Sequence, residues 1–162
     1  MKQTLFAILE PDLPGARVLD LFAGSGAAGI EALSRGAASV TFVEHDAGAT
    51  RVIAANLERT GLGGPKAVVV REDALRWVDR RAEAVEATEP FDIVIVDPPY
   101  DRRELLEQAL QAVGSLLAPG GRAVAKHFWR DVPPARIGLL ASERDRRFGE
   151  TALTFYRRQE DR

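Results

Sequence analysis

The sequence predicts a doubly wound, mostly parallel α/β domain with a seven-stranded Rossmann-like sheet in which one strand runs antiparallel. Two observations carry this prediction. Short β-branched runs alternate with amphipathic stretches along most of the chain, as in repeated βα units. Near the C-terminus, two strand-like runs, 137–143 and 151–157, are joined by the charged stretch 144–147, which is too short for a helix. Strands joined so closely are antiparallel.

The individual βα units have recognisable ends. The first predicted strand, 17–21, ends in a glycine-rich turn and leads into a helix that Gly36 terminates. Asp46 and Gly61 occupy N-cap and C-cap positions of the second helix. The other expected elements are strands 39–44, 67–71, 91–96 and 122–126, helices 74–87 and 103–117, an N-terminal helix within 1–10 and a terminal hairpin within 137–158. We expect residues 1–162 to form a single domain.

Composition excludes several classes of protein. The 162 residues are 46% hydrophobic and 28% charged, which is typical of a globular domain, and they include no cysteine. Disulfides, thiolate metal sites and cysteine nucleophiles are therefore excluded, and the two histidines lack companions at metal-ligand spacing. No run is long enough to span a membrane, and the start does not read as a signal peptide. We expect a cytoplasmic monomer without a metal.

The charge is unevenly distributed. The chain has a net charge of -2, yet residues 122–162 hold ten Lys and Arg against six Asp and Glu. A mildly basic segment is compatible with phosphate contacts, and equally with a solvated arginine-rich face.

The turn after the first strand predicts a ligand site, because open parallel sheets bind ligands beyond the carboxyl ends of their strands. Its pattern is Asp20-x-Phe22-x-Gly24-x-Gly26. Glycines let the backbone approach a ligand, and the following helix presents free amides. The Asp20 carboxylate suits a cationic amino group, which S-adenosylmethionine carries and a dinucleotide pyrophosphate does not. A glycine-rich turn alone is weak evidence, since many α/β proteins use one for packing.

Two further acidic residues close the next strands. Glu44 stands where a carboxylate accepts both ribose hydroxyls of a nucleotide, and His45 is either close to the adenosine or a surface residue. Asp73 closes the third strand, and Asp73-Ala74 is expected to flank an adenine. Because a buried carboxylate is costly without a partner, three that converge on one crevice indicate an amine-bearing, polyhydroxy ligand. S-adenosylmethionine is the predicted cofactor.

Asp97-Pro98-Pro99-Tyr100 follows an uninterrupted apolar strand and so is expected at the same rim. An exocyclic base amine is a poor nucleophile because its lone pair is delocalised into the ring. Asp97 can accept a hydrogen bond from one amine hydrogen, and the Pro98 carbonyl, held rigid by the two prolines, can accept the other. Tyr100 offers a face on which a flipped-out base can stack. These four residues are the predicted catalytic loop.

The paired motifs resemble those of class I amino-methyltransferases, which combine a glycine-rich first motif with a (D/N)-P-P-(Y/F/W) fourth motif. More narrowly, the stretches 18–26 and 29–37 closely resemble the RsmD family, and 147–151 and 4–6 are similar to its closing hairpin and leading helix. The resemblance implies methylation of N2 of one guanine in bacterial small-subunit ribosomal RNA, either as naked RNA or within a particle. RsmD-like proteins usually carry a basic segment before the first helix, whereas this sequence begins at the helix.

Other functions stay open. DNA adenine methyltransferases need a target-recognition region, and here βα units fill the interval between Asp20 and Asp97, which favours RNA. Protein-glutamine methyltransferases more typically have Asn at the position of Asp97. Gly24, Gly26 and Gly29 also fit G-x-G-x-x-G, so an NAD-dependent dehydrogenase or a non-catalytic nucleotide-binding module is a further alternative.

Some residues near the rim are secondary candidates. Lys126 and His127 end the fifth predicted strand, where either is a candidate substrate contact. Trp129 is a candidate for base stacking, whereas Trp77 has the helical position of a core residue.

Overall fold

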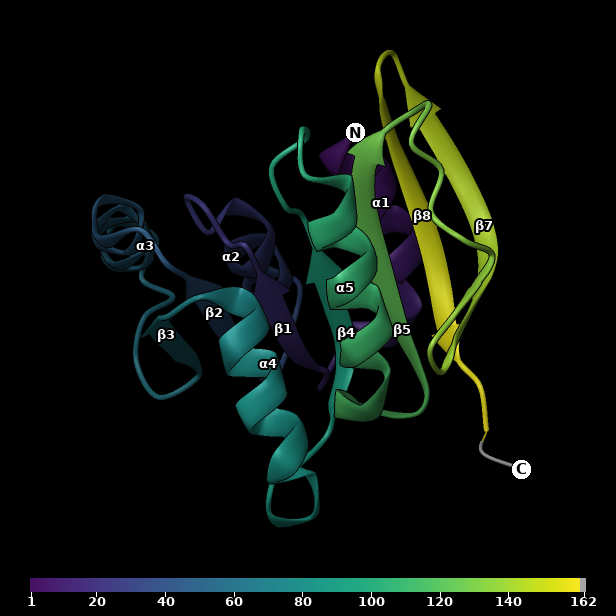
Figure 1. Ribbon diagram of the computed structural model, residues 1–162. Coiled ribbons are helices and arrows are strands. Elements are labelled where there is room, and N and C mark those ends of the chain that lie inside the picture. Colours follow the sequence, from purple (N-terminus) through teal and green to yellow (C-terminus); the bar gives the residue numbers. More distant parts are fainter. Residues whose placement is uncertain (161–162) are drawn as a thin grey trace.

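The computed structural model describes residues 1–160 and consists of an eight-stranded sheet with helices on both faces (Figure 1). The strand order is β3-β2-β1-β4-β5-β8-β7-β6. The strands are β1 (Arg17–Leu21), β2 (Ser39–Glu44), β3 (Ala67–Arg71), β4 (Phe91–Val96), β5 (Leu117–Phe128), β6 (Arg136–Ile137), β7 (Leu140–Phe148) and β8 (Thr151–Arg158). The first five run parallel, so the expected α/β sheet with a parallel body is confirmed.

The helices begin and end close to the predicted residues. They are α1 (Lys2–Leu9), α2 (Ala27–Ser34), α3 (Ala47–Thr60), α4 (Ala74–Glu83) and α5 (Arg103–Val113), with 3-10 turns η1 (Glu10–Asp12), η2 (Val85–Ala87) and η3 (Gly114–Leu116). The Asp46 side chain accepts the Ala49 N–H at 2.8 Å, and Gly61 closes α3 with a φ of 71°. Both caps of α3 are therefore confirmed. The expected helices 74–87 and 103–117 each end in a 3-10 turn instead of a full helical turn.

Two apolar layers enclose the sheet. Helices α4 and α5 cover one face, and α1, α2 and α3 cover the other (Figure 1). Trp77, the helical tryptophan expected in the core, is 5% exposed on the first face. Since both faces are covered, the central strands are mostly apolar, and the predicted site residues lie at or near the carboxyl ends of the strands.

The C-terminal part differs from the prediction in two ways. A two-residue strand, β6, adds an eighth strand, and both β6 and β8 are reversed rather than one strand alone. Gly138, with a φ of 57°, allows the tight turn between β6 and β7. The charged stretch 144–147, predicted as the hairpin turn, instead lies within β7, and the turn falls at Gly149 and Glu150. Charged side chains fit a strand whose surface is exposed to solvent.

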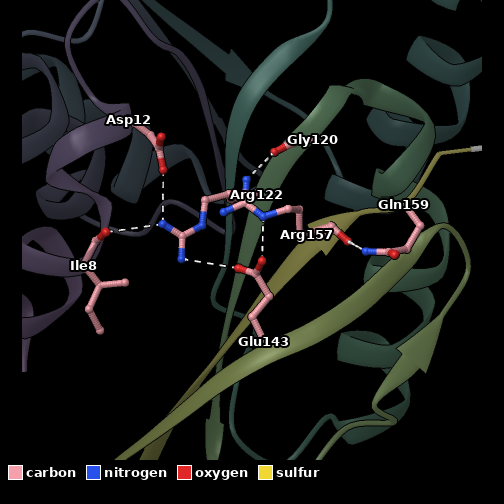
Figure 2. A network of polar contacts seen from close by, with 7 residues as sticks. All are labelled: Ile8, Asp12, Gly120, Arg122, Glu143, Arg157 and Gln159. Carbon is pink, nitrogen blue, oxygen red and sulfur yellow. Dashed lines mark hydrogen bonds and ion pairs between the residues drawn. The ribbon is translucent and has the colours of Figure 1, made fainter.

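A buried arginine fastens α1 and η1 to the sheet (Figure 2). Arg122 of β5 donates to the Ile8 carbonyl at 3.3 Å and to the Asp12 carboxylate at 3.1 Å, and it pairs with Glu143 of β7 at 3.7 Å. Arg157 of β8 donates to the same Glu143 and to the Gly120 carbonyl. The network joins the N-terminal helix to both strands of the C-terminal hairpin, and that helix forms a wall of the site described below.

Candidate functional site

The candidate site lies where the order of strands switches, between β1 and β4. Chain connections leave these neighbours in opposite directions along the sheet, so their carboxyl ends border an open crevice. A cavity of about 290 Å³ occupies this place, and its lining includes Asp20, Phe22, Gly24, Asp97 and Lys126. The two sequence motifs, far apart in the chain, therefore meet at one site.

Asp20 is the most buried carboxylate of the site. It is 2% exposed, and its Oδ2 accepts the Gly29 N–H of α2 at 3.1 Å. Burial raises the pKa of Asp20 to about 8, the Gly29 hydrogen bond partly opposes this rise, and the negative charges of Asp97 and Glu44 add to it. This cavity end therefore favours a cationic group, which would stabilise the ionised carboxylate.

Glu44 lies beside a second cavity of about 180 Å³, which Phe22 also lines. Its Oε1 accepts the Gly24 N–H at 2.9 Å and its Oε2 accepts the Asp46 N–H at 3.0 Å. These two bonds fix the carboxylate, which is 8% exposed, and connect the ends of β1 and β2. Each oxygen retains a lone pair for a further donor, such as a hydroxyl.

The remaining predicted adenosine contacts line the same second cavity. Asp73, Ala74 and His45 are all among its walls. Asp73 is also the N-cap of α4, and its Oδ2 accepts the Arg76 N–H at 3.1 Å. The His45 Nδ1 lies 3.4 Å from Glu44 Oε2, and its side chain is 75% exposed.

The glycine-rich turn has the backbone shape that its residues require. Gly24 and Gly26 have φ of 57° and 81°, and Phe22 has a φ of 58°, an unusual value for a residue with a side chain. Such strain persists only where the surroundings enforce it, and it concentrates at ligand sites. Gly26 lines neither cavity. A Cβ there would lie 3.1 Å from Ile53, so its place is explained by packing under the turn.

The loop 97–100 extends along the rim between the cavities. Asp97 lines the larger cavity, and its Oδ2 lies 3.5 Å from the Lys126 Nζ. Burial raises the pKa of Asp97, whereas Lys126 lowers it. Pro99 lines the second cavity, while Pro98 and Tyr100 border a small recess on the α5 side. The Tyr100 hydroxyl contacts the Thr151 hydroxyl of β8, so the loop is attached to the C-terminal hairpin.

Several residues that line the two cavities were not predicted from the sequence. Met1, Lys2 and Leu5 of the N-terminal segment line the larger cavity, and Arg102 and Leu105 line the smaller. Helix α1 comes to this site only through its packing on the sheet, which no local pattern encodes. Arg102 and Leu105 closely follow the loop 97–100, a position that signals proximity to the site.

Lys126 and His127, near the carboxyl end of β5, point to opposite faces of the sheet. Lys126, one of the two candidate substrate contacts, lines the larger cavity. His127 is 4% exposed, and its ring nitrogens bond the Phe128 carbonyl and the Thr154 hydroxyl at 2.7 and 2.8 Å. Since neighbouring strand residues alternate between faces, only one of the two can reach the cavity.

Within the described residues 1–160, no group of three or more His, Cys, Asp or Glu side chains could hold a metal ion. Over the same residues, no helix has the length and apolar character needed to cross a membrane.

The chain is similar to known proteins over nearly its full length. Residues 1–157 match the family described as conserved hypothetical protein 95. YlbH of Bacillus subtilis (strain 168) is 34% identical over 165 residues, which cover 98% of this chain and 85% of YlbH. Ribosomal RNA small subunit methyltransferase D of Escherichia coli (strain K12) is 39% identical over 110 residues, which cover 68% of this chain and 51% of that protein. The match thus spans about half of the length of the Escherichia coli relative.

Solved structures show the same fold. The structure of yhhF from Escherichia coli has a TM-score of 0.84 at 32% identity, covering 99% of this chain and 86% of yhhF. A hypothetical protein of Thermus thermophilus has a TM-score of 0.75 at 35% identity, covering 95% of this chain and 82% of that one. The family model matches residues 1–157, and YlbH is 34% identical to this chain over most of the length of both proteins. The chain therefore belongs to the RsmD family, which is described as conserved hypothetical protein 95.

Proposed function

We propose that this chain transfers a methyl group from S-adenosylmethionine to the exocyclic N2 amine of a guanine in small-subunit ribosomal RNA. The observation that carries the proposal is the position of the loop 97–100. Asp97 lines the same cavity as Asp20, and Pro99 lines the same cavity as Glu44. One loop with the composition needed for amine methylation therefore borders both halves of a site that fits a nucleoside joined to a cationic amino acid.

The residues present fit this cofactor. Asp20 is a buried carboxylate with its pKa raised to about 8, so a cationic amino group beside it would offset the cost of its charge. Glu44 is fixed by two backbone N–H groups and retains acceptors for ribose hydroxyls, and Asp73-Ala74 would contact the adenine. When bound, S-adenosylmethionine supplies a methyl group on a sulfonium, which makes that methyl electrophilic.

The chain's own contribution is to activate and orient the target amine. Asp97 would accept one N–H of the amine and the Pro98 carbonyl the other, which draws the nitrogen toward sp³ geometry and frees its lone pair. Two consecutive prolines keep the loop rigid. Tyr100 would stack on the flipped-out base, an interaction worth about 1–3 kcal/mol in comparable sites. Its contact with Thr151 keeps the ring near β8. The methylated amine can lose its proton to water, so no general base is required.

The substrate class rests on the relatives and on domain size. The Escherichia coli relative is named for methylation of small-subunit ribosomal RNA. Within the described residues, those that follow Tyr100 complete the sheet and form no separate domain that could read a DNA sequence. We therefore propose ribosomal RNA, presented within a small-subunit particle in the cytoplasm, as the partner.

The proposal is tested by incubating the protein with labelled S-adenosylmethionine and 30S particles from a strain that lacks its gene, followed by identification of the labelled nucleoside. N2-methylguanosine is expected. Labelled N6-methyladenine in genomic DNA offered in a parallel reaction, or labelled glutamine in a 30S protein, would replace the proposed substrate with one of the alternatives.

A variant separates chemistry from binding. Asp97→Ala should abolish methyl transfer while calorimetry shows S-adenosylhomocysteine affinity within a few-fold of the wild type. Equal loss of both would make Asp97 a structural residue. Binding of NAD with no binding of S-adenosylhomocysteine would contradict the methyltransferase proposal itself.

A further inference from the structure

The ring of a tryptophan just beyond β5 is in cation–π contact with two arginines from different segments of the chain. The Arg147 guanidinium of β7 lies 3.6 Å from the centre of the Trp129 ring, and that of Arg130 lies 4.8 Å from it. The Trp129 backbone N–H donates to the Glu150 carbonyl at 2.9 Å, which fixes the residue against the hairpin turn. Arg147 is fixed further, because its Nε donates to the Gly149 carbonyl at 2.8 Å. We call Trp129, Arg130 and Arg147 the arginine clamp.

The clamp presents positive charge that the described protein does not neutralise. Within residues 1–160, neither Arg130 nor Arg147 takes part in an ion pair, whereas Arg122 and Arg157 of the same region are paired with Glu143. Both clamp arginines are exposed. A guanidinium that is oriented on an aromatic ring, with its charge unpaired, is prepared for an anion that accepts two parallel N–H bonds.

The position of Arg147 against Trp129 changes the role expected for the tryptophan. With a guanidinium 3.6 Å from its centre, the indole face is already in contact with Arg147 and is not open to a base. Its effect is to restrict the rotamers of the arginines, which lowers the entropy that an anion must overcome on binding. Trp129 is therefore a positioning residue, and the arginines are the contacting groups.

The clamp lies beside the candidate catalytic loop. Arg147 is paired with Ala152 of β8, and Ala152 is paired with His127 of β5, next to Lys126. The residue before Ala152 is Thr151, whose hydroxyl contacts Tyr100. The tyrosine contact and the arginine clamp thus lie at the same hairpin tip, within two residues of each other on neighbouring strands. Because Arg147 is paired with Ala152 and Thr151 with Phe148, the Arg147 and Thr151 side chains leave opposite faces of the sheet there.

We infer that the arginine clamp binds phosphates of the RNA strand that flank the target nucleotide. The inference rests on the proposed function, since it takes its RNA from there. A base held at Tyr100 is attached to phosphates on both sides, and the unpaired guanidinium groups at the hairpin tip that Tyr100 contacts are complementary to such phosphates. Contacts of this kind provide affinity and register rather than base selection.

The experiment measures the affinity of the full chain for 30S particles as a function of KCl concentration. Arg130→Ala and Arg147→Ala should each weaken binding several-fold at low salt and flatten the slope of log K against log salt by about 0.7 for each phosphate that is no longer neutralised. Arg51→Ala is the matched control, because it removes an exposed arginine from α3, which lies toward the opposite edge of the sheet. It should leave the slope unchanged.

Two further variants test the role of the tryptophan. Trp129→Ala should weaken 30S binding, but it should flatten the salt slope less than removal of an arginine does. Arg147→Lys keeps the charge but not the planar stack, so its affinity for 30S particles should lie between those of Arg147→Ala and the wild type. Calorimetry with S-adenosylhomocysteine should give wild-type affinity for all of them, which excludes misfolding as the cause.

The outcomes distinguish this inference from the proposed function. If the wild type methylates 30S particles and the two alanine variants retain its affinity and slope, the clamp does not contact RNA. If the wild type binds no RNA at all, the proposed function fails and the inference with it. If the arginine variants no longer bind poly-glutamate while 30S binding is unchanged, the partner is an acidic protein and the RNA assignment is wrong.

Discussion

The Lys126 ammonium lies 3.5 Å from the Asp97 carboxylate, across the neighbouring ends of β5 and β4. The parallel register of β4 and β5 brings the two side chains together, because Val96 is paired with Ala125, and Asp97 and Lys126 are the residues that follow this pair. Burial raises the pKa of Asp97, and Lys126 acts against that rise. Only the ionised carboxylate is purely an acceptor, which is the form that an amine donor requires. Lys126 therefore favours the form that the proposed reaction needs, against the effect of burial.

Removing this lysine should shift the pH dependence of methyl transfer. Asp97 loses its acceptor form as pH falls through its pKa, so activity should decline on the acidic side. Lys126→Met raises that pKa further, and the acidic limb of the rate profile should move to higher pH with lower activity at pH 7. The profile is measured by single-turnover methyl transfer between pH 5 and 9.

Lys66→Met serves as the control for this change, because it removes a lysine just before β3, away from the cavities. A Lys126→Met profile that coincides with that of the control would show that Asp97 keeps its charge without the lysine.

Asp20 should make the ligand-free protein less stable as pH rises. Its carboxyl has an ordinary pKa near 3.8 when unfolded and about 8 when folded, so between these values the folded protein retains a proton that the unfolded chain releases. Stability contributed by this group is therefore fully present below about pH 4 and is lost as pH rises toward 8. Asp20→Asn should melt at least about 3 °C above wild type at pH 8, the shift expected for about 1 kcal/mol in such a domain. At pH 4 the two proteins should melt together.

Cofactor binding should reverse this protonation. A cationic amino group beside Asp20 favours the charged carboxylate, so binding of S-adenosylhomocysteine near pH 7 should release protons. Calorimetry in two buffers of different ionisation enthalpy measures the number released. Proton release that persists unchanged in Asp20→Asn would assign it to another group.

The success of sequence reasoning at this site has a physical limit. Asp20, Glu44, Asp73 and Asp97 could be predicted to converge because parallel strands end at one rim, and each lines one of the two cavities. Which of Lys126 and His127 enters the cavity could not be predicted from the sequence, since the face that each occupies depends on the register of β5 with β8.

Charged residues in the C-terminal hairpin misled the prediction for a related reason. The stretch 144–147 has the composition of a turn, yet it pairs residue by residue with β8. Strand pairing there is imposed by buried residues of the neighbouring strand β8, such as Phe155 and Tyr156, which lie outside the stretch and so do not enter its local composition. The wall that α1 adds to the larger cavity is equally a product of tertiary packing.

A single methyl group at Gly29 should disrupt the floor of the site. A Cβ there would lie 2.3 Å from the Phe42 ring and 2.8 Å from the Val40 side chain, both of which are fully buried. Gly29→Ala should therefore lose about 1–3 kcal/mol of unfolding free energy, as overpacked cores do, measured by urea denaturation. It should also weaken cofactor binding, because the Gly29 N–H holds Asp20.

Gly48→Ala provides the comparison, since Gly48 is also near the start of a helix, and the nearest atom to a Cβ there is the capping Asp46 Oδ2, at 3.1 Å, which needs to shift by only a few tenths of an ångström. Helix propensity alone favours alanine by up to about 1 kcal/mol. If both variants had the same stability, the packing of α2 on β2 would have room for a Cβ at position 29, and the prediction would be wrong.

Arg122 should control the α1 wall of the larger cavity from a distance. Its guanidinium, 10% exposed, connects the Ile8 carbonyl and Asp12 to the sheet, and α1 supplies Lys2 and Leu5 to the cavity. Arg122→Met should leave these acceptors unpaired and lower the unfolding free energy by about 1–3 kcal/mol. It should also speed amide hydrogen exchange in α1 and weaken binding of S-adenosylhomocysteine. Arg157→Met, which removes a partner of Glu143 but no contact with α1, should leave exchange in α1 unchanged. Equal exchange in the two variants would show that apolar packing alone holds α1 in place.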